Sequence, residues 1–133
     1  MLPLIAEWQR VTHALLHAVE AELADAHLSA AETNLLACFA GAPARTVREL
    51  LAATGQRPST LTGVLDRLER RHLVTRTPNP ADRRSVLVDL TPNGQIAADR
   101  VAAAFATVEA RLPADAAACL ISQIRNTLVT NTR

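Results

Sequence analysis

The strongest constraint on the fold is a change of hydrophobic period in the middle of the chain. Apolar residues recur at steps of three and four through 58–72, which predicts a helix with one buried face. Residues 73–77 and 85–90 are then predicted as two strands around a turn rich in Pro and Asn. Just before them, a capping box at 46–49 opens a short helix that Gly55 ends. This order of helix, turn, helix and hairpin is that of a winged helix-turn-helix.

Longer amphipathic helices flank this core on both sides. One is predicted over 3–26, and a capping box at 29–32 begins the next. A third is predicted over 91–112, and a last one follows Pro113. Because the first and last helices are too apolar for isolated arms of a small domain, we expect them to interlock with those of a second copy. The prediction is a mainly α (α+β) single domain over 1–133, with dimerisation helices at 3–28 and 92–131 and a winged helix-turn-helix core with a two-stranded β-wing at 29–91.

Positive charge is concentrated in the middle of the chain. The formal net charge is only +1, but residues 57–84 carry seven arginines against three acids. A basic segment of this kind attracts phosphate. Aromatic residues make up only 2% of the chain, which argues against a protein that stacks the bases of single-stranded nucleic acid. Double-stranded DNA is therefore the expected partner.

The predicted helix at 58–72 presents a polar face opposite its leucines. Hydroxyl groups at a helix N-terminus bind phosphate or base edges, and the helix dipole favours phosphate there. Gly63 costs a helix interior about 1 kcal/mol relative to alanine, so we attribute it to the close approach of a DNA backbone. The alternative is a plain surface helix with scattered arginines. The predicted DNA contacts on and beside this helix are Arg57, Ser59, Thr60, Thr62, Gly63, Arg67 and Arg70.

The tip of the predicted hairpin, at 79–85, is a second candidate contact. Two adjacent arginines at a turn, Arg83 and Arg84, can reach a phosphate or a minor groove. We expect Asp82 to brace Arg84 through a short-range ion pair. The alternative is a solvated turn.

Residues 59–69 and 80–94 resemble the MarR family of bacterial transcriptional regulators. The more specific part of the resemblance is Asp-x-Arg at 82–84, followed by a strand and by Leu-Thr-x-x-Gly at 90–94. The order of elements is similar from about residue 4 to residue 130. One departure is Arg71-His72-Leu73, which stands where the family often has a glycine after the recognition helix.

The resemblance implies an obligate homodimer whose terminal helices form a dimerisation layer. It implies a recognition helix in the major groove, with Ser59, Thr60 and Thr62 near bases and phosphates. It also implies that Arg84, held by Asp82, enters the minor groove. Arg83 is expected to contact phosphate.

From these features we predict a sequence-specific, dimeric DNA-binding transcriptional regulator that represses its own or neighbouring genes from a pseudo-palindromic operator. A small-molecule effector in the crevice between dimerisation layer and winged helix would release it only by binding the DNA-free geometry more tightly. The alternative is a winged-helix protein-interaction or dimerisation module without its own operator. No catalytic constellation stands out, so an enzyme is not expected. No apolar run suits a membrane span and the start does not resemble a secretory signal, so a cytoplasmic protein is expected.

The first predicted helix carries weaker candidates for ligand binding. These are Trp8, His13 and His17. His13, His17 and Glu20 also have a spacing that allows a divalent metal, but a polar stripe is the simpler interpretation, and neither a metal nor a cofactor is expected.

The two cysteines, Cys38 and Cys119, are far apart and fit no metal spacing. We interpret them as reduced thiols. Cys38 lies in an apolar stretch where inert packing is the main interpretation and oxidant sensing the alternative.

Overall fold

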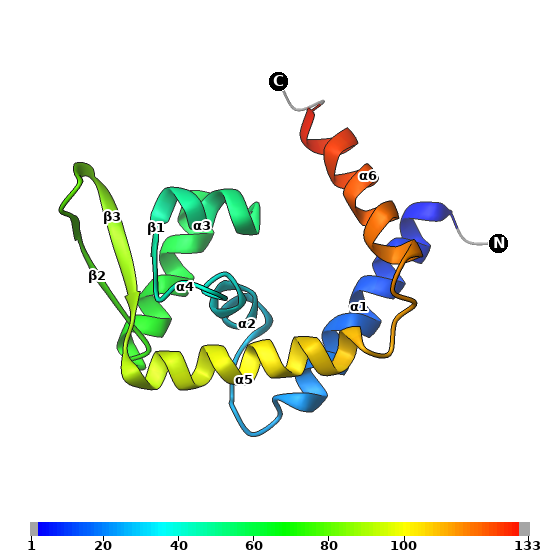
Figure 1. Cartoon of the computed structure of the whole chain (residues 1–133), viewed down its shortest axis with the longest axis horizontal. Helices are drawn as coiled ribbons and strands as arrows, with labels where there is room; N and C mark the ends of the chain where they lie inside the picture. Colours follow the sequence, from blue (N-terminus) through cyan, green and yellow to red (C-terminus); the bar gives the residue numbers. More distant parts are fainter. Residues whose placement is uncertain (1–2, 131–133) are drawn as a thin grey trace.

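The computed structural model describes residues 3–130, apart from the side chains of residues 116, 117, 120, 129 and 130. These residues form six helices and a three-stranded antiparallel sheet (Figure 1). The helices are α1 (Leu4–Glu22), α2 (Ala30–Ala37), α3 (Val47–Thr54), α4 (Pro58–Arg70), α5 (Pro92–Glu109) and α6 (Ala116–Thr130). The strands are β1 (Ala44–Thr46), β2 (Val74–Asn79) and β3 (Asp82–Leu90).

Helices α2, α3 and α4 form the helix-turn-helix, and the predicted caps are confirmed. Ser29 Oγ accepts a hydrogen bond from the Glu32 amide at 3.1 Å, and Thr46 Oγ1 accepts one from the Glu49 amide at 3.1 Å. Each cap satisfies an amide that has no partner inside its helix. Gly55 ends α3 in the left-handed conformation, with φ 65°, as the sequence predicts for a helix stop.

The predicted hairpin is present, but the sheet has a third strand. β3 pairs antiparallel with β2 on one side and with β1 on the other. The predicted two-stranded wing, formed by β2 and β3, is confirmed. No sequence pattern indicates β1, because a three-residue strand is too short to show a period of two. The hairpin strands also run closer to the tip than predicted, with only Pro80 and Ala81 between them. Pro78 is tolerated inside β2 because β2 is an edge strand.

The hydrophobic core lies among α2, α3, α4, α5 and the sheet. Its fully buried side chains are leucines and valines, namely Leu35, Leu36, Leu50, Leu61, Val64, Leu65, Leu68, Val74, Val88 and Val101. The four of these that belong to α4 are the face that the sequence predicts to be buried. Helix α4 therefore turns its polar face outward.

Helix α1 is shorter than the predicted 3–26. It ends at Glu22 because Leu23 turns into the core, at 6% exposure, and the chain reverses through His27 with φ 53°. Although α1 is fully described, none of its residues is buried.

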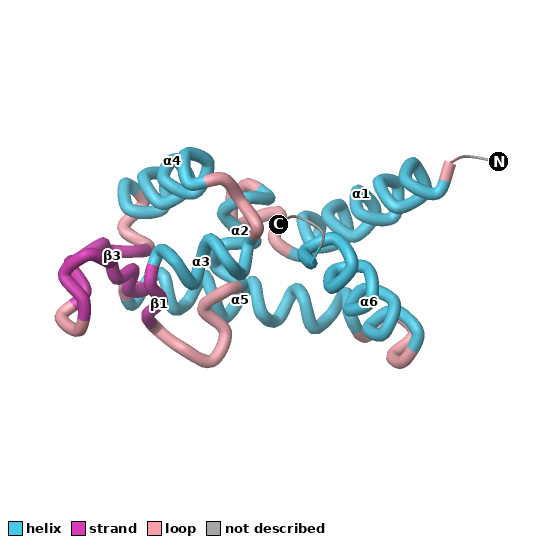
Figure 2. Tube along the Cα trace, turned by 90° about the horizontal axis from the view of Figure 1, so that it is seen from above, coloured by secondary structure: helices cyan, strands magenta, loops and turns pink. Residues whose placement is uncertain are grey.

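Helix α5 connects the winged part to α1, and α6 projects from the far end of α5 (Figures 1 and 2). Large apolar side chains are exposed on these helices, among them Leu4, Ile5, Val11, Leu112 and Ile121.

The connection between α4 and β2 places His72 in the left-handed region, with φ 57°. A residue with a side chain adopts this conformation at a cost of about 1–2 kcal/mol. The turn is held by Thr91 at the start of α5. Thr91 Oγ1 donates to the His72 carbonyl at 2.6 Å, and the Thr91 amide donates to the Leu73 carbonyl at 3.0 Å. Histidine therefore makes the turn for which glycine is the least strained residue.

Candidate nucleic-acid interface

The first turn of α4 presents amides and hydroxyls to solvent. Arg57 is the N-cap and Pro58 is the first helical residue, and in the described chain no side chain caps the turn. Ser59 and Thr60 are exposed. Thr62 Oγ1 donates to the Pro58 carbonyl at 2.9 Å, which leaves its oxygen free to accept another hydrogen bond. Free amides, hydroxyls and the helix dipole together make this turn suited to an anionic group.

Gly63 lies one residue further along α4. A Cβ placed there would have Arg67 Nη1 as its nearest neighbour, at 3.8 Å. This is an ordinary contact, so within the described residues no steric conflict requires glycine. The space beside Gly63 is open to an external surface, and the predicted approach of DNA there stays a prediction.

Hydrogen bonds fix the shape of the wing tip. Asn79 Nδ2 donates to Ser85 Oγ at 2.9 Å, and Asn79 Oδ1 accepts from the Ala81 amide at 3.0 Å. Ser85 Oγ donates to the Asp82 carbonyl at 3.2 Å. Asp82 Oδ1 accepts from the Arg84 amide at 3.0 Å. Asp82 thus braces the backbone of Arg84, as aspartate does in many turns, and the expected ion pair between their side chains is not formed among the described residues.

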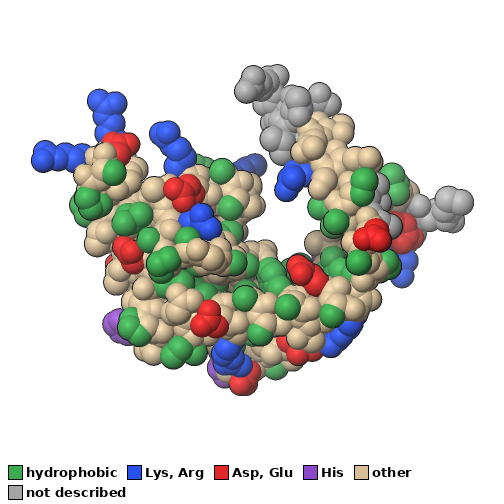
Figure 3. Space-filling model, viewed as in Figure 1, with side chains coloured by type: hydrophobic (Ala, Val, Ile, Leu, Met, Phe, Trp, Pro, Cys, Tyr) green, Lys and Arg blue, Asp and Glu red, His purple; other side chains and the backbone are tan. Residues whose placement is uncertain are grey.

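Basic side chains project from the wing tip into solvent (Figure 3). Arg83 and Arg84 are both exposed, and neither has an acidic partner in the part of the chain that the structure describes. Their guanidinium groups are therefore available to an external anion.

Other arginines of the basic segment are already paired within the fold. Arg76, on β2, donates through Nε to Glu69 Oε2 at 2.7 Å and through Nη2 to Asp66 Oδ1 at 2.6 Å. Both acids belong to α4, and their hydrogen bonds raise the pKa of Arg76 further above its ordinary value. Arg76 therefore connects the wing to the recognition helix rather than reaching outward.

Glu32 pairs with two more arginines, at the C-terminal end of α4. It is buried at 6% exposure. Arg71 Nη1 donates to Glu32 Oε2 at 3.0 Å, and the same guanidinium donates to the carbonyls of His27 and Ala26 at 2.9 and 3.1 Å. Arg67 Nε lies 3.8 Å from Glu32 Oε1. The charge of Arg67, a predicted DNA contact, is thus partly neutralised by the fold, although about half of its side chain is exposed.

Three arginines near α3 and α4 lack an acidic partner among the described residues. Arg57 is exposed at the start of α4. Arg70 is exposed, and its Nε donates to the Asp66 carbonyl at 3.3 Å. Arg48, exposed in the first turn of α3, was missed by the sequence reasoning because it lies outside the basic segment. Its position inside the capping box at 46–49, in the first turn of a predicted helix, was the available signal.

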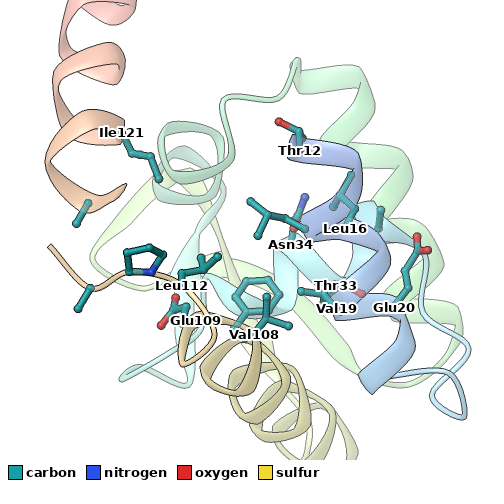
Figure 4. A pocket seen from close by; sticks show the side chains of 16 residues that line it. Thr12, Leu16, Val19, Glu20, Thr33, Asn34, Val108, Glu109, Leu112 and Ile121 are labelled. Carbon is teal, nitrogen blue, oxygen red and sulfur yellow. The ribbon is translucent and has the colours of Figure 1, made fainter. Parts of the chain in front are cut away.

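A cavity of about 700 Å³ lies between α1, α2, α5 and α6 (Figure 4). Its wall is mainly apolar, and α1 contributes Thr12, Leu16, Val19 and Glu20 to it. Of the ligand candidates on α1, neither Trp8 nor the two histidines line this cavity. The apolar residues of α1 that do line it were predicted only as a packing face.

No group of three His, Cys, Asp or Glu side chains within the described residues is arranged to hold a metal ion. The spacing of His13, His17 and Glu20 along the sequence is therefore not completed by a nearby ligand from another element.

The surroundings of Cys38 disfavour a reactive thiolate. The thiol donates to the Asn34 carbonyl at 3.3 Å. Burial raises the pKa of Cys38, and the opposing effect of Arg45 is smaller. This environment supports the interpretation of Cys38 as a packing residue. Cys119 is exposed on α6.

Known proteins resemble the chain both in its core and over most of its length. Residues 28–86 match the family model described as MarR family. The HTH-type transcriptional repressor NicR of Pseudomonas putida is 46% identical over 46 residues, which is 35% of this chain and only 29% of NicR. The HTH-type transcriptional repressor MdtR of Bacillus subtilis is 30% identical over 110 residues, which is 83% of this chain and 68% of MdtR.

The chain belongs to the MarR family. It is accordingly a winged-helix DNA-binding transcriptional regulator and not an enzyme. Among residues 3–130, none of the helices has the length and apolar character needed to span a bilayer.

Solved structures of MarR-family proteins share this architecture. A cysteine-to-serine mutant of MarR from Escherichia coli, complexed with operator DNA, matches with a TM-score of 0.76 and 27% identity over 96% of this chain and 94% of that chain. The apo form of the wild-type protein matches with a TM-score of 0.67. CouR from Rhodococcus jostii, bound to p-coumaroyl-CoA, matches with a TM-score of 0.73 and 30% identity over 90% of this chain and 85% of that chain.

Proposed function

We propose that this MarR-family protein is a cytoplasmic, homodimeric repressor that reads a pseudo-palindromic operator of its own or neighbouring genes. The observation that carries the proposal is the polar face of α4, whose uncapped first turn adjoins unpaired arginines. The wing tip supplies two more unpaired arginines. The higher TM-score to the operator-bound MarR than to its apo form supports the view that this conformation is the one that binds DNA.

Each half of the dimer places α4 in a major groove. Ser59, Thr60 and Thr62 contact base edges and phosphates, and Gly63 allows the backbone of the DNA to come close. The two recognition helices lie about 34–36 Å apart, so the half-sites are one helical turn apart. Arg57, Arg70 and Arg83 contact phosphate, and Arg84 enters the minor groove. Arg67 also contacts phosphate, with the part of its positive charge that Glu32 does not neutralise.

The second copy packs on α6 and on apolar side chains of α1 that do not line the cavity, such as Leu4, Ile5 and Val11. A fully described 19-residue helix without a buried residue, α1, supports this arrangement. Burial of its exposed apolar side chains is the driving force for association.

The cavity between the dimerisation helices and α2 is proposed as an effector site. A ligand there releases DNA only if it binds the DNA-free geometry more tightly than the DNA-bound one. The position of the cavity, beside the helix-turn-helix and under α1 and α6, supports this role because a ligand there contacts both parts.

The decisive test is the affinity of the purified protein for the DNA upstream of its own gene, measured by fluorescence anisotropy against a random duplex. Replacing Arg84 or Thr62 by alanine should weaken binding to the upstream DNA about tenfold or more, because each replacement removes a groove contact of about 1–3 kcal/mol. Arg10→Ala, an exposed arginine on α1 paired only with Glu7 among the described residues, is the matched control and should bind as the parent does. Equal affinity of parent, Arg84→Ala and Thr62→Ala, with intact dimers, would show that the proposed docking is wrong.

A further inference from the structure

The charged groups in the wall of the cavity all have one sign. Glu20 of α1 and Glu109 of α5 line it, and no arginine or histidine does among the residues described there. The two glutamates lie on opposite sides of the labelled side chains, with Val108, Leu16 and Thr33 between them (Figure 4). A ligand in this space therefore meets carboxylates from two helices and no cation.

Neither carboxylate is neutralised within the described chain. Neighbouring acids show the contrast. Glu22, two residues after Glu20, accepts a hydrogen bond from Arg111 Nη2 at 2.8 Å, and Asp25 is hydrogen-bonded by Arg100. Arg100 and Arg111 are thus engaged outside the cavity, and Glu20 and Glu109 have no basic partner among the described residues.

Thr33 supplies a second polar group that points to a ligand. It is buried at 6% exposure and lines the cavity. Other helical threonines of the described chain, such as Thr12, Thr62 and Thr107, donate to the carbonyl four residues earlier. Thr33 makes no such bond in the described chain, so the hydroxyl of this buried residue of the cavity lining is available to a ligand.

From these observations we propose that the effector cavity takes a lipophilic organic cation. The apolar wall holds the body of the ligand, and Glu20 and Glu109 balance its positive charge. An anion of the same shape is disfavoured because it would face two unpaired carboxylates. This proposal rests on the proposed function only for its regulatory consequence, since binding to the cavity is measurable without DNA.

Two ions of nearly identical shape and opposite charge test the proposal. Tetraphenylphosphonium and tetraphenylborate are titrated separately into the full-length protein by isothermal titration calorimetry, without DNA. The phosphonium should bind about tenfold or more tightly than the borate, because opposite charges a few ångströms apart near a protein surface contribute that much or more. Preference for the borate, equal affinities or no binding of either ion would each overturn the proposal.

Matched variants locate the charge preference. In the double variant Glu20→Gln with Glu109→Gln, the phosphonium should lose about tenfold in affinity and the borate should lose none. Glu7→Gln removes an exposed carboxylate of α1 that does not line the cavity, and it should change neither affinity. If the double variant keeps the full preference, the cation is not held by these carboxylates and the proposal fails.

Operator binding is measured separately on the same preparations. Binding of the parent to upstream DNA together with preference for the borate would leave the proposed function standing and remove the cation proposal. Preference for the phosphonium in a protein that does not bind DNA would leave the cation proposal standing and remove the proposed function.

Discussion

Two helical glycines of this protein have opposite explanations. A Cβ on Gly94 would lie 1.8 Å from the Leu73 carbonyl oxygen, so the fold itself requires glycine where α5 passes that turn. A Cβ on Gly63 would meet only ordinary contact, with Arg67. The described residues therefore do not require glycine at position 63, so a requirement for it has to come from a surface that binds there.

Gly63→Ala should separate stability from DNA binding. The free energy of unfolding in urea should rise by about 1 kcal/mol, because alanine is the better helix former. Affinity for the upstream DNA should fall, because the added methyl group keeps the DNA backbone away. The matched control is Gly94→Ala, which should lower the free energy of unfolding by about 1–3 kcal/mol through overpacking. Unchanged DNA affinity in Gly63→Ala would contradict a close approach at this residue.

At the residue scale, the sequence predicts local features well and pairing poorly. The caps at Ser29 and Thr46 and the helix stop at Gly55 depend on neighbours within a few residues, and all three are confirmed. The sequence treats Arg67 as a free cation, whereas Glu32, its partner, lies 35 residues earlier in the chain. Only the packing of α2 against α4 brings these two together.

At the scale of elements, Arg76 joins the wing to α4. This residue of β2 bonds two carboxylates of α4, so the wing and the recognition helix are joined by charge as well as by the core. Glu32 and Arg71 connect α2 to the C-terminal end of α4 by an ion pair as well. Ion pairs thus join α2, α4 and the wing in addition to the contacts of the core.

Arg76→Gln should therefore weaken DNA binding although Arg76 is not proposed to touch DNA. The free energy of unfolding should fall by about 1–2 kcal/mol, because two carboxylates lose their charged partner at a partly exposed site. Amide hydrogen exchange should become faster in β2, since the wing is less tightly held to α4. Arg45→Gln is the control, because the side chain of Arg45 bonds the carbonyls of Cys38 and Ala40 and pairs with Glu49 of α3, whereas only its backbone pairs with β3. If Arg76→Gln leaves both wing exchange and DNA affinity unchanged, the wing is positioned by the core alone.

The elements themselves were predictable wherever they are long enough to show a period. The buried face of α4 follows directly from leucine spacing, and so does the existence of the hairpin. β1 was not predictable, because Ala44–Thr46 becomes a strand only by pairing with β3. The early end of α1 was not predictable either, because the apolar pattern continues through Leu23 whereas the helix ends at Glu22.

At the scale of the whole molecule, the chain combines a buried core with an uncovered layer. The core belongs to the winged part, whereas α1 and α6 expose apolar side chains. The cavity proposed as the effector site lies between these two parts. Sequence reasoning predicted the layer and a crevice, but not which residues line it, because the lining comes from four helices distant in the sequence.

Ile5→Glu should dissociate the proposed dimer. Ile5 is 68% exposed on α1, and a carboxylate there would be buried without a partner in the interface. The dimer dissociation constant from sedimentation equilibrium should rise by about tenfold or more, and operator affinity should fall with it. Ile96→Glu is the matched control, because Ile96 is 61% exposed on α5 at its winged end. Equal dimerisation of both variants would place the interface elsewhere.

The hydrogen-bonded wing tip has a consequence for how the protein meets its operator. Asn79, Asp82 and Ser85 hold the tip in one shape before any DNA arrives. The backbone of a flexible tip would lose about 1–2 kcal/mol of conformational entropy per residue on binding. Here the backbone of the tip has already lost this entropy during folding, so Arg83 and Arg84 bind DNA from a backbone that is already ordered. Association should then proceed without a disorder-to-order step, and its rate should be set by diffusion and charge.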